Sequence, residues 1–133
     1  EGIAGAGYFN AGQDCTAATR VIGGPGVYAD LVDALAEQAK GTVYGNPLDD
    51  NTYMGPVISQ VQRERVEGFI ERKPSNAEVV TGGAEPDGPG FFYKPTVVAG
   101  MEQGDEMVQK EIFGPVVTVQ QFASEEQAGS TIM

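Results

Sequence analysis

Cys15 is the only cysteine among the 133 residues of this chain, which include no histidine. Its thiol is the group best suited to nucleophilic chemistry. Its neighbours predict the start of a helix: Gly12 can break the incoming chain, and Asp14 or Thr16 can act as an N-cap. We therefore expect Cys15 at a helix N-terminus, where unpaired N–H groups and the helix dipole favour the thiolate. The alternative is a small buried cysteine, and a carboxylate at Asp14 would oppose its ionisation.

The lack of histidine also limits the chemistry that Cys15 can do. A cysteine–histidine hydrolase is excluded within one chain, because no imidazole can take the thiol proton. The sequence has no Cys-x-x-Cys pair for thiol redox chemistry, and residues 49–51 lack the spacing of a calcium loop. No metal site is therefore expected.

Residues 9–20 resemble the active-site cysteine signature of the aldehyde dehydrogenase superfamily, in the pattern Phe9-Asn10-x-Gly12-Gln13-x-Cys15-x-Ala17-x-x-Arg20. Residues 14–18 are most similar to the branch that acts on aminobutyraldehyde and betaine aldehyde. The resemblance implies that the Cys15 thiolate attacks an aldehyde, that hydride passes to NAD or NADP, and that water hydrolyses the resulting thioester. It also implies that the Cys15 N–H donates to the oxyanion, and that Asp14 and Thr16 lie near a cationic amino-aldehyde substrate.

A second signature lies 96 residues after Cys15 (111 − 15), close to the separation in that family. Residues 110–116 match its Glu-x-Phe-Gly-Pro segment, in the run Lys110-Glu111-Ile112-Phe113-Gly114-Pro115-Val116. The resemblance implies that Glu111 accepts hydrogen bonds from the nicotinamide ribose and that Phe113 packs beside the nicotinamide ring. The alternative is a solvated glutamate before a turn and an aromatic residue of the core.

A third segment, residues 55–66, resembles the family in the pattern Gly55-Pro56-x-Ile58-Ser59-x-x-Gln62-x-x-Arg65-Val66. The resemblance makes Gln62 and Arg65 candidate contacts to the adenosine ribose. A capping box between Ser59 and Gln62, with Arg65 exposed on the helix, explains the same residues without a ligand.

The elements that must position these residues alternate between strands and helices. Helical periodicity is expected over 27–40 with Gly41 as C-cap, from Ser59 to about Arg72, and in a short turn at 106–110. Strands are expected at 19–23, 78–81 and 116–122, with residues 91–98 extended and Pro95 at an edge or a break. The glycine-rich residues 2–7 and 23–26 are expected to be loops, and residues 128–133 do not resemble the helix that the family has there. This order predicts an α/β fold, a mostly parallel sheet with flanking helices, as in the aldehyde dehydrogenase catalytic domain.

Length and composition complete the sequence-based prediction. The chain is one domain in size, and its net charge of −11 disfavours binding to nucleic acid or anionic membranes. The family resemblance implies that residues 1–133 are part of the cysteine-bearing catalytic domain, without the NAD-binding Rossmann domain, the general-base glutamate and the asparagine oxyanion donor. Such a chain should be cytoplasmic, inactive alone and prone to self-association or homo-oligomer formation. The rival interpretation is a non-catalytic acidic interaction or structural module with a buried cysteine.

Overall fold

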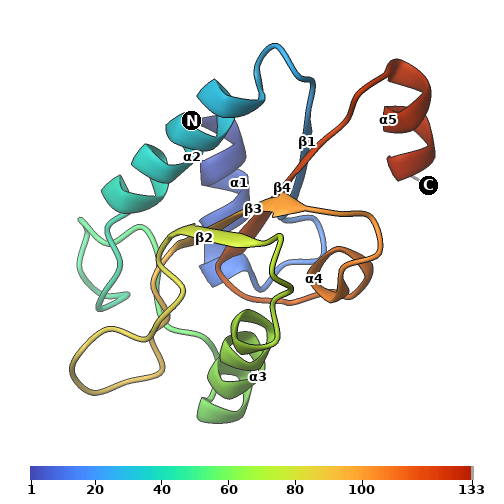
Figure 1. The fold of residues 1–133 in the computed structure, drawn as a ribbon. Helices are drawn as coiled ribbons and strands as arrows, with labels where there is room; N and C mark the ends of the chain where they lie inside the picture. The colour runs from blue at the N-terminus through green and yellow to red at the C-terminus, as the bar shows by residue number, and fades with distance from the viewer. Residues whose placement is uncertain (133) are drawn as a thin grey trace.

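The computed structural model describes residues 1–132, which fold around a four-stranded sheet in the order β1-β4-β3-β2 (Figure 1). The strands are β1 (Arg20–Gly23), β2 (Glu78–Thr81), β3 (Thr96–Met101) and β4 (Val116–Gln121). Strands β1 and β3 both run parallel to β4, whereas β2 pairs antiparallel with β3. The predicted α/β class with a mostly parallel sheet is confirmed.

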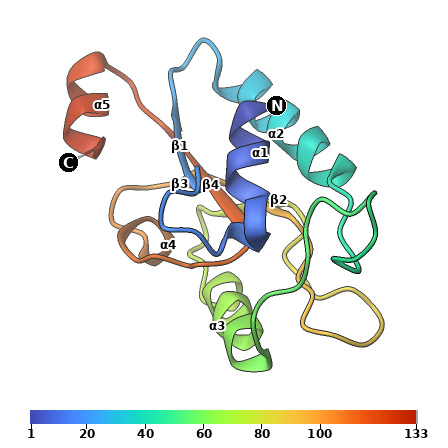
Figure 2. The same cartoon turned by 180° about the vertical axis from the view of Figure 1, so that it is seen from behind.

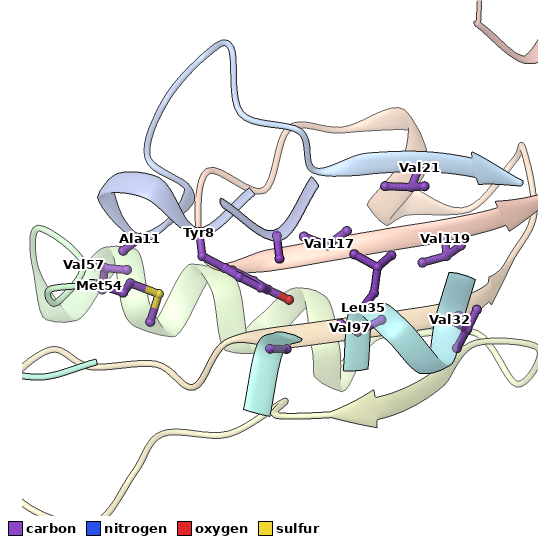
Figure 3. Packing of buried hydrophobic residues seen from close by; sticks show 13 residues of the cluster. Tyr8, Ala11, Val21, Val32, Leu35, Met54, Val57, Val97, Val117 and Val119 are labelled. Atoms are coloured by element: carbon purple, nitrogen blue, oxygen red, sulfur yellow. The ribbon is translucent and has the colours of Figure 1, made fainter. Parts of the chain in front are cut away.

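Helices cover both faces of the sheet, as the two opposite views show (Figures 1 and 2). The described residues form α1 (Gly2–Tyr8), the 3-10 helix η1 (Phe9–Gly12), α2 (Tyr28–Gly41), α3 (Gln60–Glu71), α4 (Glu106–Gln109) and α5 (Glu125–Ile132), of which α5 stands apart from the sheet. Side chains alternate across a strand, so Val97 joins the apolar cluster under α1 and α2, and Val98 joins the cluster under α3 and α4. The first cluster, which also includes Tyr8 and Leu35, is shown in Figure 3.

Helix α1 differs from the loop expected for the glycine-rich residues 2–7. Ala4 and Tyr8 are buried against the sheet, and the Tyr8 hydroxyl donates a 2.8 Å hydrogen bond to the Thr96 carbonyl. Burial raises the pKa of Tyr8, which keeps this donor protonated. Packing of one apolar face therefore outweighs the low helix propensity of glycine.

The predicted boundaries of the central elements are close to the observed ones. Helix α2 ends one residue later than expected, because Gly41 is still helical and Thr42 takes the C-cap position. The Ser59 hydroxyl caps α3 by accepting from the Gln62 N–H at 3.2 Å. Pro95 directly precedes β3, which pairs on both sides, so this proline marks a break and not an edge strand.

Helix α5 corrects the expectation that residues 128–133 are not helical, as far as Ile132; Met133 lies outside the described residues. Ser124 Oγ accepts from the Gln127 N–H at 3.2 Å, and Gln127 Oε1 accepts from the Ala123 N–H at 2.6 Å. These two bonds form a variant of the capping box, which the Ser-x-x-Gln spacing could have predicted. Within residues 1–132, no helix has the length and apolar character needed to cross a membrane.

Candidate active site

Cys15 lies in a tight turn between η1 and β1, and no helix begins there. The Ala17 N–H donates to the Asp14 carbonyl at 3.1 Å, while Asp14 Oδ1 accepts from the Thr16 N–H at 2.8 Å and the Thr16 hydroxyl at 2.7 Å. Asp14 thus closes a turn instead of capping a helix. The predicted helix N-terminus is wrong, and so is the buried cysteine, because Cys15 is exposed.

The turn holds the carboxylate of Asp14, the residue that precedes Cys15. The backbone and hydroxyl donors of Thr16 hold the pKa of Asp14 below its ordinary value, so the carboxylate is ionised at neutral pH. The Cys15 N–H donates to no protein acceptor within residues 1–132. This backbone donor is therefore free to donate to an acceptor from outside the described residues.

The residues before the turn form a left-handed segment held in place by two amide side chains. Asn10, Ala11 and Gly12 have φ values of 51°, 56° and 70°. Asn10 Nδ2 donates to the Gln13 carbonyl at 3.0 Å, and Gln13 Nε2 donates to the Asn10 carbonyl at 3.1 Å. Gln13 Oε1 also accepts from the Ile58 N–H at 2.8 Å, which ties the cysteine segment to the residues that lead into α3.

The two signature segments meet backbone to backbone. A Cβ atom on Gly12 would lie 2.0 Å from the Gly114 carbonyl oxygen, so only glycine permits this approach. Residues far apart in the sequence are thereby brought together, with the cysteine turn on one side and the Glu-Ile-Phe-Gly-Pro segment on the other.

Residues 111–113 alternate between solvent and core. Glu111 and Phe113 are exposed, whereas Ile112 is buried in the cluster under α3. Phe113 has a φ of 59°, which is uncommon for a bulky side chain. This conformation presents the side chains of Glu111 and Phe113 to solvent while Ile112 anchors the segment.

Gln62 and Arg65 contact this segment directly from α3. Gln62 Nε2 donates to the Phe113 carbonyl at 2.7 Å and to the Ile112 carbonyl at 3.3 Å. The Arg65 guanidinium donates to the carbonyls of Ile112 and Glu111, the latter at 2.6 Å. The capping box is thus only half formed, because the Gln62 side chain turns to residues 112 and 113.

An open groove of about 480 Å³ runs between the signature segments. Its lining residues are Asn10, Gln13, Pro56, Val57, Ile58, Phe91 and Phe113. Glu111 instead lines a cavity of about 180 Å³ together with residues 19–20 and 107–112, and Cys15 lines neither of these two spaces. Sequence analysis assigned no role to Asn10 and Gln13, although both belong to the cysteine signature.

The fold and the signature segments match a known family over nearly the whole chain. The model for the aldehyde dehydrogenase family matches residues 1–132. The chain belongs to the aldehyde dehydrogenase family. The resemblance of residues 9–20 and 110–116 is therefore confirmed at the level of the family.

Individual aldehyde dehydrogenases align with most of the chain. An aldehyde dehydrogenase of Emericella nidulans is 38% identical over 122 residues, which is 91% of the chain and 24% of that relative. A betaine aldehyde dehydrogenase of Bacillus subtilis is 37% identical over 125 residues, covering 90% of the chain and 26% of that relative. The chain thus spans about a quarter of the length of these relatives.

A solved structure supports the same fold. The crystal structure of betaine aldehyde dehydrogenase from Staphylococcus aureus, in complex with NAD+, aligns with a TM-score of 0.92 at 35% identity. The alignment covers 97% of this chain and 27% of that one. The four-stranded sheet and its flanking helices are therefore an aldehyde dehydrogenase fold.

Proposed function

We propose that this chain supplies the nucleophile and part of the nicotinamide site of an NAD(P)-dependent aldehyde dehydrogenase, which oxidises an aldehyde to a carboxylate. One observation carries the proposal: the cysteine segment and the signature segment of residues 110–116 touch at Gly12 and Gly114. A nucleophile and a hydride acceptor must share one site in this reaction, and contact between the two segments is what that requires.

In the proposed reaction, the Cys15 sulfur attacks the carbonyl carbon of the aldehyde, and the carbonyl oxygen becomes an oxyanion. The Cys15 N–H would donate to this oxyanion, a type of interaction worth about 3–4 kcal/mol per donor. Glu111 and Phe113 would hold the nicotinamide half of NAD, which would supply the hydride acceptor, and a thioester would then remain on Cys15. Water then hydrolyses the thioester, so that carboxylate leaves and the thiol is restored.

The residues near the groove fit a nicotinamide. Phe113, which is 37% exposed, offers an aromatic face beside the apolar side chains of Val57 and Phe91. Glu111 is exposed on the same segment and would accept from the ribose hydroxyls. Contacts from Gln62 and Arg65 to the adenosine ribose stay a prediction from the family resemblance.

The substrate class we propose is a cationic amino-aldehyde such as 4-aminobutanal. The Asp14 carboxylate, kept ionised by Thr16, would attract a positive charge to the mouth of the site. The Thr16 hydroxyl would act through Asp14, to which it donates. The similarity to betaine aldehyde dehydrogenases, whose substrate is also cationic, supports this assignment.

We further propose that the general base, the second oxyanion donor and the phosphate-binding Rossmann domain lie outside these 133 residues. The chain alone should then turn over little or no substrate, and the enzyme should work as a cytoplasmic homo-oligomer. The rival interpretation as an acidic interaction module loses its premise of a buried cysteine, because Cys15 is exposed.

The activity is tested with 4-aminobutanal and NAD, both on the 133-residue chain and on the full-length protein. The chain should be inactive, and Cys15→Ala should abolish turnover in the full-length protein. Asp14→Ala should raise KM for 4-aminobutanal more than KM for butanal. Robust turnover by the chain alone would refute its incompleteness, undiminished turnover by Cys15→Ala would refute the nucleophile, and equal losses on both aldehydes would refute the role of Asp14.

A further inference from the structure

The backbone of residues 111–113 is held by side chains of α3 at three consecutive carbonyls. Arg65 donates to the carbonyls of Glu111 and Ile112, and Gln62 donates to those of Ile112 and Phe113. The planar guanidinium makes two bonds in a fixed fork, which lysine could not reproduce. These bonds determine the direction of the peptide groups from which the side chains of Glu111 and Phe113 project.

Arg65 is itself held in one orientation. Its guanidinium carbon lies 5.2 Å from the centroid of the Phe69 ring, and Phe69 is buried in the same cluster as Ile112. The cation therefore lies between an aromatic face and two carbonyl oxygens. One edge of the Arg65 guanidinium therefore already has its hydrogen-bond acceptors within the protein.

The segment needs this support because of its conformation. Phe113 has a φ of 59° and is 37% exposed, so partial burial of its side chain must be joined by backbone contacts to hold this uncommon conformation. The buried side chain of Ile112 anchors the segment to the core, and the hydrogen bonds from Gln62 and Arg65 hold its backbone.

We propose that Gln62 and Arg65 are positioning residues, which act on the dinucleotide through the 111–113 segment by fixing Glu111 and Phe113. This inference rests on the proposed function, in which Glu111 and Phe113 contact the nicotinamide half of the cofactor. It differs from a direct contact to the adenosine ribose, because it predicts a change in the segment itself when either donor is removed.

The test uses the full-length protein with Arg65→Lys, Gln62→Met and the control Arg63→Lys. Arg63 is on the same helix but donates to the Gly90 carbonyl at 2.8 Å and pairs with Glu85 at 3.0 Å, away from the segment. Cleavage by a glutamate-specific protease under native conditions is measured after Glu111 and, for comparison, after Glu67 in α3, together with NAD+ affinity by fluorescence titration.

We expect the rate of cleavage after Glu111 to rise on the order of tenfold in Arg65→Lys and Gln62→Met, the factor that about one net hydrogen bond supplies. Cleavage after Glu67 should stay unchanged, NAD+ affinity should fall by a similar factor, and Arg63→Lys should alter neither. Unchanged cleavage after Glu111 with weaker NAD+ binding would overturn positioning in favour of direct contact. Faster cleavage after Glu111 with unaltered NAD+ binding would also overturn it, and failure of the unmodified protein to bind NAD+ would instead refute the proposed function.

Discussion

At the scale of single residues, the site depends on backbone conformations that few side chains adopt. Ala11 and Phe113, one in each signature segment, have φ values of 56° and 59°. Each left-handed non-glycine residue costs about 1–2 kcal/mol, and such strain is concentrated at functional sites. The left-handed residues lie where the two segments touch, so the surrounding hydrogen bonds must hold them there.

Gly12→Ala should disrupt the contact between the cysteine segment and the segment that contains Gly114. At a φ of 70°, the new Cβ would lie 2.0 Å from the Gly114 oxygen, which already accepts from the Val116 N–H at 2.8 Å and so cannot move away without straining that hydrogen bond. We expect a loss of about 3 kcal/mol or more in the free energy of unfolding, measured by urea denaturation. Gly26→Ala is the control, because its Cβ would meet no atom within 4 Å, and it should change stability by less than about 1 kcal/mol. Equal effects of the two substitutions would contradict this account.

The sequence identified Cys15 but not the conformation around it. Asp14 can cap a helix or close a turn, and both choices satisfy its side chain equally. A contact with residues far away in the sequence favours the turn over the helix. The Thr118 N–H donates to the Thr19 carbonyl at 2.8 Å, so the chain after the turn is extended beside β4. The same limit applies to Gln62, whose side chain bonds to residues 112 and 113 and not to its own helix start.

At the scale of elements, helices with a strong apolar period are predictable and short ones are not. Helix α2 follows its pattern, and its buried residues Val32, Leu35 and Ala39 are all on the expected face. Helix α1 is only seven residues long and contains three glycines, so its stability comes from burial of Ala4 and Tyr8. The partners that bury Ala4 and Tyr8 lie in the sheet, so residues 2–8 alone could not predict this helix.

Helix α5 should depend on its N-terminal cap. Ser124→Ala removes the acceptor of the Gln127 N–H, and we expect the helix to lose about 1 kcal/mol of stability against local unfolding. Amide exchange over residues 127–131 measures this loss without global unfolding. Ser130→Ala, within the same helix, should leave exchange unchanged or slow it, since alanine is the better helix former. Faster exchange in both variants would show that the cap is not the cause.

At the scale of the whole molecule, a strong negative charge acts against the association that an exposed apolar surface favours. The net charge is −11, whereas Ile58 and Val61, near the groove and the start of α3, are 81% and 75% exposed. Like charges keep copies of the 133-residue chain apart, and apolar contact would bring them together. The balance between the two forces is set by ionic strength.

Self-association of the 133-residue chain should therefore rise with salt, as sedimentation velocity can measure. The Debye length falls from about 10 Å at 0.1 M to about 3 Å at 1 M, which screens repulsion between copies and leaves apolar attraction intact. Ile58→Asp should weaken association at every salt concentration, because it places a charge on the apolar surface beside the groove. Leu48→Asp adds the same charge at a leucine that is 91% exposed on the loop 46–51. If Leu48→Asp weakened association as much as Ile58→Asp does, net charge alone would account for the effect, and the groove would not be the contact surface.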